Sequence, residues 1–230
     1  MKNMGFRSLR LAEPVAFDDP AFFKTESDRM AWGAADLLAS RREFPELQEA
    51  LADAVLVAGT IADPPDGHTI LAPRALAPVL LDAAERGTVA LLFGQERIGL
   101  TREALGRCQV IGSIPSSASY GSLNLSQAVL IFLYEIRMAA LTLGGDRQVA
   151  REPGGSPAAQ EEPPTQAEIE GFYGRLISTL DGIGYFEGSA RAHMVRELRR
   201  IFNRALLTRR EVRILEGIVH RIDLDRSRRA

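Results

Sequence analysis

Residues 88–137 read TVALLFGQERIGLTREALGRCQVIGSIPSSASYGSLNLSQAVLIFLYEIR and contain two apolar strands, each followed by a loop of small and polar residues. The strand at 89–93 breaks into a glycine-containing loop at 94–99. The strand at 109–114 runs through Pro115 into Gly121 and Asn124, and an amphipathic helix follows. Open α/β sheets bind ligands at the carboxyl ends of their strands. The stretch therefore predicts a ligand site at one edge of a parallel sheet.

The flanking sequence alternates strand and helix patterns. It opens on residues 1–5, which are predicted to end a helix with Gly5 as its C-cap. Apolar runs predict strands at 8–12 and 54–58, and the second of these is continuous, as in a strand buried on both faces. Helical periodicity is predicted at 26–39, 43–51 and 73–86, in a short helix from Thr101 to Arg107, and in a long helix ending near Leu143. This alternation predicts an α/β fold with a parallel sheet.

A linker divides the chain into two parts. Residues 144–164 are rich in Gly, Pro and charge, which is typical of a domain boundary. After it, Thr165 with Glu168 and Thr208 with Glu211 form two capping boxes that begin helices, the second running to Ile222, with a third helix at 191–206 between them. We expect a body at 1–143 and an all-α extension at 165–230. The extension is too small to be very stable alone, so it is expected to pack on the body or on a second subunit.

The charge of the chain is unevenly distributed. The formal net charge is −2, but the segment from Ser189 to Ala230 holds twelve Arg and five acidic residues, a net +7. A basic segment on an acidic body favours an electrostatic partner such as nucleic acid, and a solvated helical face is the alternative.

Composition narrows the class of protein further. With 46% hydrophobic and 25% charged residues the chain has the make-up of an ordinary globular protein. The absence of a long apolar run and of a secretory leader predicts a cytoplasmic protein with no membrane contact. Cys108 is the single cysteine, and His68, His193 and His220 are scattered, so no metal site is predicted.

The loops after three strands could hold a nucleotide-type ligand or could be structural turns. Glycines such as Gly59 and Gly94 let a ligand approach the backbone closely. However, the chain has neither a G-x-G-x-x-G run after a first strand nor a Walker lysine. This disfavours a nicotinamide-binding oxidoreductase, while a nucleotide-type ligand and plain turns remain equally open.

The combination of motifs is more specific than its parts. The G-x-E-x-x-G loop at 94–99 and the S-x-N-x-S-x-A helix start at 122–128 resemble motifs 2 and 3 of the SpoU/TrmH class of SPOUT RNA methyltransferases. Residues 1–6, MKNMGF, resemble the end of motif 1 of that class. Segments 170–173, 198–204 and 211–218 resemble the C-terminal extension of its TrmJ branch.

This resemblance implies a fold, an activity and a cofactor. The fold would be a SPOUT-type parallel sheet with a trefoil knot around motifs 2 and 3, in a homodimer. The activity would be 2′-O-methylation of a nucleotide in the tRNA anticodon loop, with S-adenosyl-L-methionine as cofactor. By motif, the implied cofactor contacts are Thr60, Ile61, Ala62, Gly94, Ile114, Gly121, Ser122 and Leu123.

Further roles follow from the same resemblance. Ser122 and Asn124 are the catalytic candidates, and Asn124 is also expected to fix the loop and begin the following helix. Glu96 is expected to be structural, capping backbone amides. Arg97 would contact an RNA phosphate or the partner subunit, with a plain surface charge as the alternative. The basic extension would dock RNA through Arg199, Arg200 and Arg204.

The sequence departs from the family pattern at two places. The N-x-G-x-x-A-R run of motif 1, whose Arg is credited with activating the 2′-hydroxyl or holding the RNA phosphate, does not precede residues 1–6 here. Residues 61–66, IADPPD, are acidic where Arg is usual. We expect that the first strand and the start of motif 1 are missing from this chain. The alternative is a catalytically compromised member that binds RNA or cofactor without turnover.

Overall fold

A computed structural model describes residues 1–14, 29–31, 33–62, 70–117, 121, 123–146, 162–186 and 191–229. Its body contains a four-stranded, all-parallel sheet in the order β4-β6-β3-β5. These strands are β3 (Ala54–Thr60), β4 (Ile70–Leu71), β5 (Thr88–Leu92) and β6 (Val110–Gly112). A second, two-stranded parallel sheet pairs β1 (Arg10–Ala12) with β2 (Arg42–Phe44). The predicted α/β class with parallel strands is confirmed.

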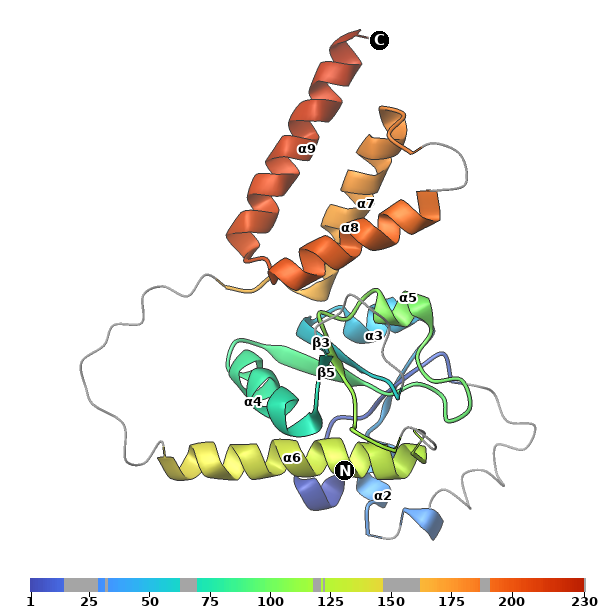
Figure 1. Ribbon diagram of the computed structural model, residues 1–230, viewed down its shortest axis with the longest axis vertical. Coiled ribbons are helices and arrows are strands. Elements are labelled where there is room, and N and C mark those ends of the chain that lie inside the picture. The colour runs from blue at the N-terminus through green and yellow to red at the C-terminus, as the bar shows by residue number, and fades with distance from the viewer. Residues whose placement is uncertain are drawn as a thin grey trace.

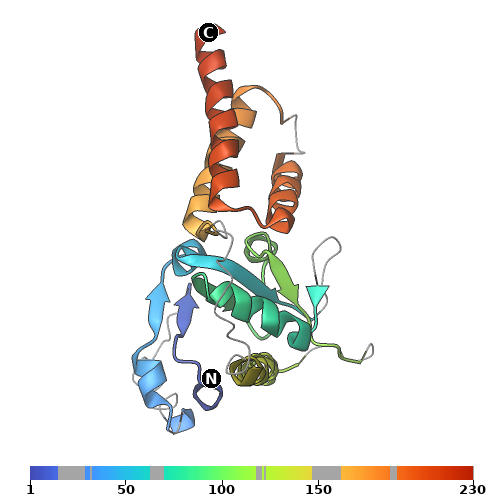
Figure 2. The same ribbon diagram turned by 90° about the vertical axis from the view of Figure 1, so that its left-hand side faces the viewer.

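Helices pack on both faces of the main sheet and form a separate group beyond it (Figures 1 and 2). Those of the body are η1 (Lys2–Met4), α2 (Ala35–Ala39), α3 (Leu47–Leu51), α4 (Pro73–Ala84), α5 (Arg102–Leu105) and α6 (Leu125–Asp146). The described residues after 161, here called the tail, contain α7 (Gln166–Gly182), α8 (Arg191–Ala205) and α9 (Arg209–Arg229). The tail is all-α, as predicted.

The core of the body has two layers. Helices α4 and α6 cover one face of the sheet and pack together there, with Leu76, Leu80 and Phe132 buried between them and the strands. Leu51, Leu105 and Cys108 fill the other face. A methyl group on Gly112 would come within 2.6 Å of the Phe132 ring, so α6 can cross β6 this closely only because residue 112 is glycine.

Three sequence expectations need correction. Residues 42–44 lie in β2, with Glu43 paired to Leu11, although 43 and 44 were expected to open the helix that in fact begins at Leu47. Phe44 precedes Pro45, and a residue before proline is disfavoured in the helical conformation. The short strand β4 gave no sequence signal, and α9 extends to Arg229 instead of ending at residue 222.

The ends of several helices are as expected. Both capping boxes are present: the Thr165 hydroxyl accepts from the Glu168 amide, and the Thr208 hydroxyl accepts from the Glu211 amide at 3.2 Å. Gly5 closes η1 with φ of +84°, a left-handed conformation that suits glycine. These local signals therefore set the starts of α7 and α9 and the turn after residue 4.

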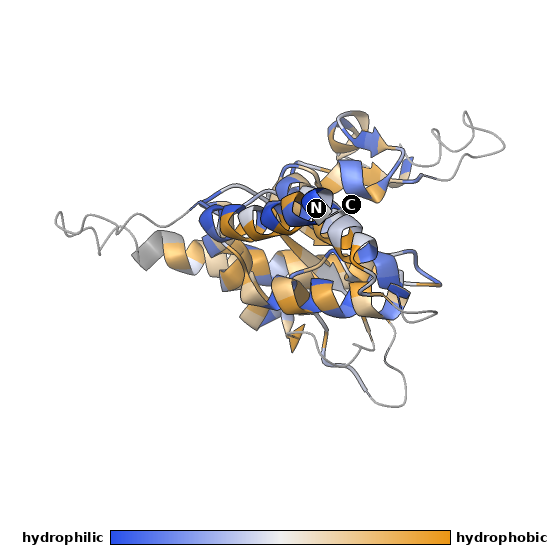
Figure 3. Ribbon diagram, turned by 90° about the horizontal axis from the view of Figure 1, so that it is seen from above, coloured by the Kyte–Doolittle hydropathy of each residue, from blue (hydrophilic) through white to orange (hydrophobic). Residues whose placement is uncertain are grey.

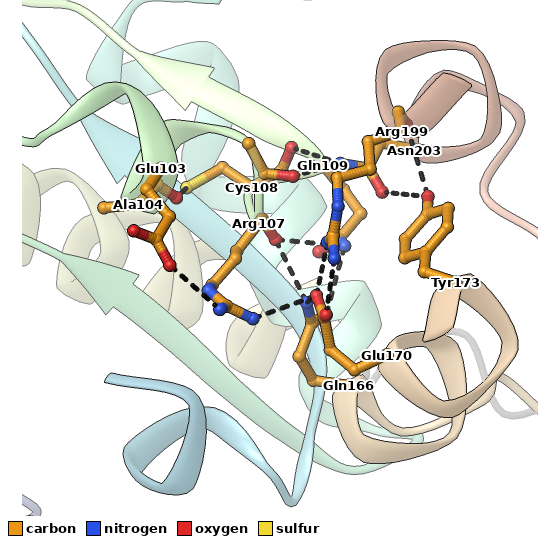
Figure 4. A network of polar contacts seen from close by, with 11 residues as sticks. Glu103, Ala104, Arg107, Cys108, Gln109, Gln166, Glu170, Tyr173, Arg199 and Asn203 are labelled. Atoms are coloured by element: carbon orange, nitrogen blue, oxygen red, sulfur yellow. Dashed lines mark hydrogen bonds and ion pairs between the residues drawn. The ribbon is translucent and has the colours of Figure 1, made fainter. Parts of the chain in front are cut away.

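The tail packs on its own body at the amino ends of β3 and β6 (Figure 4). The Ala167 amide donates to the Ala52 carbonyl at 3.1 Å, next to the start of β3. The Asn203 side-chain amide donates to the carbonyls of Gly106 at 3.0 Å and Cys108 at 3.3 Å, just before β6. In this structure the tail therefore contacts the body of its own chain.

An ion cluster lies in the same junction. Glu170 accepts two hydrogen bonds from Arg199, at 2.6 and 2.7 Å, and lies 3.1 Å from Nη1 of Arg107. The Glu170 side chain is 8% exposed, and the Arg199 guanidinium also lies over the Tyr173 ring. Burial acts to raise the pKa of Glu170, but the hydrogen bond and charge of Arg199, together with Arg107, hold the pKa below its ordinary 4.5. The carboxylate therefore stays ionised between two cations.

We expect Glu170→Gln to lower the free energy of unfolding by roughly 2–3 kcal/mol at pH 7, because it leaves the mostly buried Arg199 guanidinium without its counter-charge and leaves Arg107 paired with Glu103 alone. A lowered folded-state pKa contributes stability that is present above the unfolded pKa, about 4.3, and is lost as pH falls through the folded value. The advantage of the wild-type protein over the variant should thus shrink progressively as pH falls below about 4.3. Denaturant unfolding of both proteins from pH 7 to pH 3 measures this.

The matched control is Glu162→Gln, which removes a carboxylate from an exposed ion pair with Arg209 in the same tail. Exposed pairs contribute little to stability, so this variant should unfold with the wild type at each pH. Equal losses in both variants, or a gap between wild type and Glu170→Gln that does not shrink as pH falls from 7 to 3, would contradict the role given to Glu170.

Candidate active site

Hydrogen bonds join the carboxyl ends of three strands into one edge. The Thr60 hydroxyl, at the end of β3, donates to the Leu92 carbonyl of β5 at 2.7 Å. The Ile61 amide donates to the Gly112 carbonyl of β6 at 3.1 Å. The residues after β3, β5 and β6 therefore leave the sheet side by side, as the sequence predicted. We call described residues 60–62, 93–99, 113–117, 121, 123 and 124 the carboxyl edge.

The loop after β5 is a tight turn that depends on glycine. The Gly99 amide donates to the Gln95 carbonyl at 2.7 Å, and Gly99 has φ of +72°. A methyl group on Gly94 would lie 2.0 Å from the Gly99 carbonyl carbon. The two ends of the loop can lie this close only without a side chain at residue 94, so Gly94 shapes the loop itself.

Asn124 connects this loop to α6. Its side-chain nitrogen donates to Glu96 Oε1, while its side-chain oxygen accepts from the Ser126 amide at 2.9 Å and the Ser126 hydroxyl at 2.5 Å. Its carbonyl accepts from the Ala128 amide at 3.0 Å, so Asn124 is the N-cap of α6. The partner that the structure gives Glu96 is this side-chain amide, where backbone amides were expected.

The other predicted ligand contacts gather at the same edge. Ile61, Ile114 and Leu123 are each partly buried there. The Ser113 hydroxyl donates to the Ala62 carbonyl at 3.5 Å, and the Ser116 hydroxyl donates to the Gly121 carbonyl at 2.9 Å. Ser122 lies outside the described residues. Apolar side chains beside backbone polar groups suit a ligand with a flat, mostly apolar part and a polar rim, such as an adenosine group.

The predicted RNA-binding arginines lie at two ends of the molecule. Arg97 is exposed in the loop after β5, at the carboxyl edge. Arg200 and Arg204 are on α8, in the tail at the opposite end of the sheet. Arg199 is held by Glu170 in the junction, with its side chain 19% exposed. The structure therefore does not bring these four residues together.

A further basic residue of α8 was not singled out from the sequence. Arg196 precedes Arg200 and Arg204 at intervals of four residues, which places the three on one face of the helix. Arg196 and Arg204 are exposed and form no ion pair among the described residues, and Arg200 pairs with Glu197 at 2.5 Å. Spacing by four within the predicted helix was the signal that could have revealed this row.

The single cysteine lies away from the carboxyl edge, just before β6. The Cys108 thiol donates to the Ala104 carbonyl at 3.2 Å, and burial raises its pKa to about 12, which keeps it protonated and unreactive. In the part of the chain that the structure describes, no three His, Cys, Asp or Glu side chains group in a way that could hold a metal ion.

Comparison with family models finds two matches along the chain. The model of the SpoU rRNA methylase family matches residues 1–134. The model of the C-terminal domain of the tRNA methyltransferase TrmJ matches residues 167–230. The two matches follow one another in the order of the body and the tail.

Whole-chain relatives are similar along nearly their full length. A tRNA (cytidine/uridine/adenosine-2′-O-)-methyltransferase TrmJ of Pseudomonas aeruginosa is 37% identical over 95% of this chain and 84% of its own. A tRNA (cytidine/uridine-2′-O-)-methyltransferase TrmJ of Escherichia coli is 35% identical over 97% and 87%. Among solved structures, TrmJ from Z. mobilis superposes with a TM-score of 0.78 at 28% identity, covering 97% of this chain and 90% of that one.

The link between Glu96 and Asn124 can be tested by replacing its donor. Asn124→Asp keeps the oxygen that caps α6 but places a carboxylate against Glu96, so we expect a loss of about 1 kcal/mol in the free energy of unfolding. Adding Glu96→Gln to Asn124→Asp supplies an amide donor in the reverse direction and should restore most of that loss. Denaturant unfolding of the two single variants and the double variant yields the coupling energy.

The control for the cap itself is Ser126→Ala, which removes the hydroxyl that bonds to Asn124 and leaves Glu96 untouched. Ser126 and Glu96 are connected only through the Asn124 side chain, so Ser126→Ala should couple to Glu96→Gln more weakly than Asn124→Asp does, which Glu96→Gln should compensate. Additive losses in the Asn124 and Glu96 pair would show that the two side chains are not linked.

Proposed function

The chain belongs to the SpoU rRNA methylase family, in its TrmJ branch, and we propose that it methylates the ribose 2′-hydroxyl of a tRNA nucleotide with S-adenosyl-L-methionine as methyl donor. The observation that carries the proposal is the carboxyl edge itself, where the loops of motifs 2 and 3 are joined through Glu96 and Asn124. Following the resemblance, we place the target nucleotide in the anticodon loop.

The residues at the carboxyl edge fit this cofactor. Ile61, Ile114 and Leu123 provide apolar, partly buried contacts for the adenine ring, and the backbone near Thr60, Ala62, Gly94 and Gly121 provides polar groups for its edge and for the ribose. The bound cofactor supplies an electrophilic methyl group. We assign Ser122 to the same cradle from its place in motif 3.

In this reaction the protein chiefly aligns the ribose oxygen with the methyl group of the cofactor. A methyl group is transferred in line, so the ribose oxygen must be held opposite the leaving sulfur. Asn124 holds the loop of motif 2 against the start of α6, and both segments flank the proposed cofactor site. We therefore assign Asn124 a positioning role and keep Ser122 as the candidate to contact the reacting hydroxyl.

The tail would bind the RNA at a point distant from the reacting ribose. Arg196, Arg200 and Arg204 form one row on α8, and their charges suit contacts to phosphates. Arg199 serves a structural purpose in this arrangement, since it fastens α8 to α7 through Glu170. Arg97 is placed to contact RNA at the edge where the chemistry occurs.

The activity is tested with unmodified tRNA and labelled S-adenosyl-L-methionine. We expect one 2′-O-methyl nucleoside in the anticodon loop, located by nuclease digestion and mass spectrometry. A tRNA carrying a 2′-deoxy sugar at that position should accept no label, which separates ribose methylation from base methylation. Gly94→Ala should abolish the product, because the added methyl group would open the loop of motif 2.

A labelled base, or label in the deoxy substrate, would overturn the proposed reaction. Salt-sensitive tRNA binding without any product would favour the alternative of a binding protein without turnover. Arg204→Gln is a matched variant outside the site: it should weaken tRNA binding without altering the product formed at saturating tRNA.

The exposed face of α6 supports a homodimer. The large apolar residues of this face are Leu130, Tyr134, Met138 and Leu141, each 42–53% exposed, and α6 is predominantly apolar along its length (Figure 3). By length and composition, residues 125–143 could also cross a membrane, a test that a helix packing on another protein helix passes as well. We propose that a second copy covers this face and that the protein works in the cytoplasm with its tRNA substrate.

The domain boundaries and the knot remain part of the proposal. We infer a methyltransferase domain at 1–143, a linker at 144–164 and a helical extension at 165–230. From the family resemblance we propose a trefoil knot around motifs 2 and 3, two segments that the bond between Glu96 and Asn124 brings into contact.

A charge on the apolar face should prevent dimer formation. We expect Leu141→Glu to convert a dimer into a monomer, because an ionised carboxylate would have to lose its hydration between two copies. Light scattering coupled to size-exclusion chromatography measures the mass. Ile214→Glu is the matched control: Ile214 is 55% exposed on α9, and its replacement should leave the mass unchanged. A dimer that survives Leu141→Glu would place the interface elsewhere.

A further inference from the structure

The carboxyl end of α7 points away from the body and carries aromatic and charged side chains (Figure 1). At 1.5 Å per residue, this end lies roughly 24 Å along the helix from Gln166, which bonds to Gln109 at the junction. The residues that form the cluster come from α7, the turn after it, α8 and α9. We call them the tip of the tail: Asp181, Tyr185, Phe186, Arg191 and Arg226.

Tyr185 is exposed although its backbone is fixed. Its amide donates to the Leu180 carbonyl at 3.0 Å, and the Gly184 amide donates to the Asp181 carbonyl at 3.1 Å. Gly184 has φ of +73°. These two bonds around a left-handed residue form a Schellman motif, which ends a helix with a defined turn. The turn therefore holds Tyr185 in one position, while the residue is 48% exposed to solvent.

The two aromatic rings of the tip are held by each other and by an arginine. The ring centroids of Tyr185 and Phe186 are 5.3 Å apart, and the rings meet edge to face at 77°. The Arg191 guanidinium lies over the Phe186 ring, 5.7 Å from its centroid. Arg191 also donates two hydrogen bonds to the Asp181 carboxylate, at 3.0 and 2.7 Å. These contacts orient the rings before any ligand arrives.

Two cations border the exposed ring. The Arg191 side chain is 52% exposed in spite of its pair with Asp181. Arg226 comes from α9, and its guanidinium lies over the backbone of Gly182, where a methyl group would overlap it. Both arginines belong to the segment 189–230, in which twelve Arg face five acidic residues. The tip thus combines an accessible aromatic face with positive charge.

We propose that the tip stacks on an unpaired base of the tRNA, with Tyr185 as the ring that the base covers. The inference rests on the proposed function. Every nucleobase has a flat face that stacks on aromatic side chains, and a nearby arginine strengthens such a contact. Bases inside a double helix are already stacked on both faces, so the base must be unpaired. The phosphates beside it would meet Arg191 and Arg226.

The position of the tip decides which part of the RNA it can contact. The carboxyl edge lies at one end of β3, whereas the tail is attached near the other end and α7 extends away from it. A base at the tip therefore belongs to a different part of the RNA from the nucleotide methylated by the same chain. Because stacking accepts any base, the tip would recognise an unpaired position and not a sequence.

The surface of a second copy is the competing occupant. The large apolar residues exposed beside the turn are Ile183, at 49%, and Tyr185. A stable protein interface buries about 800 Å² on each partner around an apolar centre, which is more than two such side chains provide. One ring beside exposed arginines matches a single base and its phosphates in size and charge, so RNA is favoured.

The test measures tRNA affinity against salt for variants of Tyr185. Tyr185→Leu keeps an apolar side chain but removes the flat face, so binding should weaken roughly tenfold. The slope of log affinity against log salt should not change, because a lost stack releases no counterion, whereas Arg204→Gln should make the slope shallower by about one. Tyr185→Phe restores the ring and should recover the affinity of the wild type.

Tyr185→Trp reports the stack directly. The indole that it introduces should stack on the base, so tRNA should quench its fluorescence. The wild type contains one tryptophan, Trp32, and subtracting a titration of the wild type isolates the new signal. Absence of quenching at saturating tRNA would contradict the proposal.

Ile214→Ala is the matched control, since Ile214 is an apolar residue of the same tail that is 55% exposed. It lies twelve residues before Arg226 on α9, roughly 18 Å along the helix. This variant should bind tRNA as the wild type does. The thermal shift caused by S-adenosylhomocysteine should be unchanged in the Tyr185 variants, because they leave the carboxyl edge intact.

Two further results would overturn the proposal. In the first, the wild type methylates tRNA but Tyr185→Leu binds it with unchanged affinity; the proposed function then stands and the stacking contact does not. In the second, Tyr185→Leu lowers the mass measured by light scattering, which would assign the tip to a second copy. Failure of the wild type to bind or methylate tRNA would reject the proposed function as well.

Discussion

The hydrogen bonding of β3 to both of its neighbours is the constraint on which the rest of the molecule depends. β3 pairs with β5 on one side and β6 on the other, and it is buried along most of its length. Its carboxyl end holds the edge together through Thr60 and Ile61. Near its amino end, Ala52 and Val57 bond to the tail and to Gln109. β3 thus connects the proposed active site at its carboxyl end to the contacts with the tail at its amino end.

The proposed cofactor site and the basic tail therefore lie at opposite ends of β3. The carboxyl edge is made of glycines, small polar residues and half-buried apolar side chains, which suit a cofactor. The tail carries the excess positive charge of the chain, which suits a polyanion. Because the tail is fastened to the body by buried hydrogen bonds and by Glu170, its basic row keeps a fixed relation to the edge. A rigid separation of this kind lets an enzyme select an RNA by its shape while its chemistry stays local.

Local signals in the sequence were sufficient for the fold class and for much of the site. Gly5, Thr165 and Thr208 were interpreted as helix caps from their own neighbours, and each of these caps is present. The loops after β5 and β6 were placed at one edge because parallel strands share a direction. The sequence does not predict which distant segments contact one another. β2 forms because β1 lies beside it, and Glu96 meets Asn124 only once both loops are folded.

The arginines also show that sequence alone does not predict which side chains can bind RNA, because their burial and pairing decide the free energy of that contact. Arg199 and Arg200 are neighbours in sequence with equal charge, yet the first has its guanidinium enclosed by Glu170 and Tyr173 while the second lies in a surface pair. A guanidinium already desolvated and paired would have to lose those bonds to meet a phosphate, so its charge adds little to RNA affinity. An exposed one gives up only water and counterions. Arg196 and Arg204, on the same helix, meet that second condition, and for this reason the count of charges along a chain is a poorer guide to RNA contact than the count of charges the fold leaves unpaired.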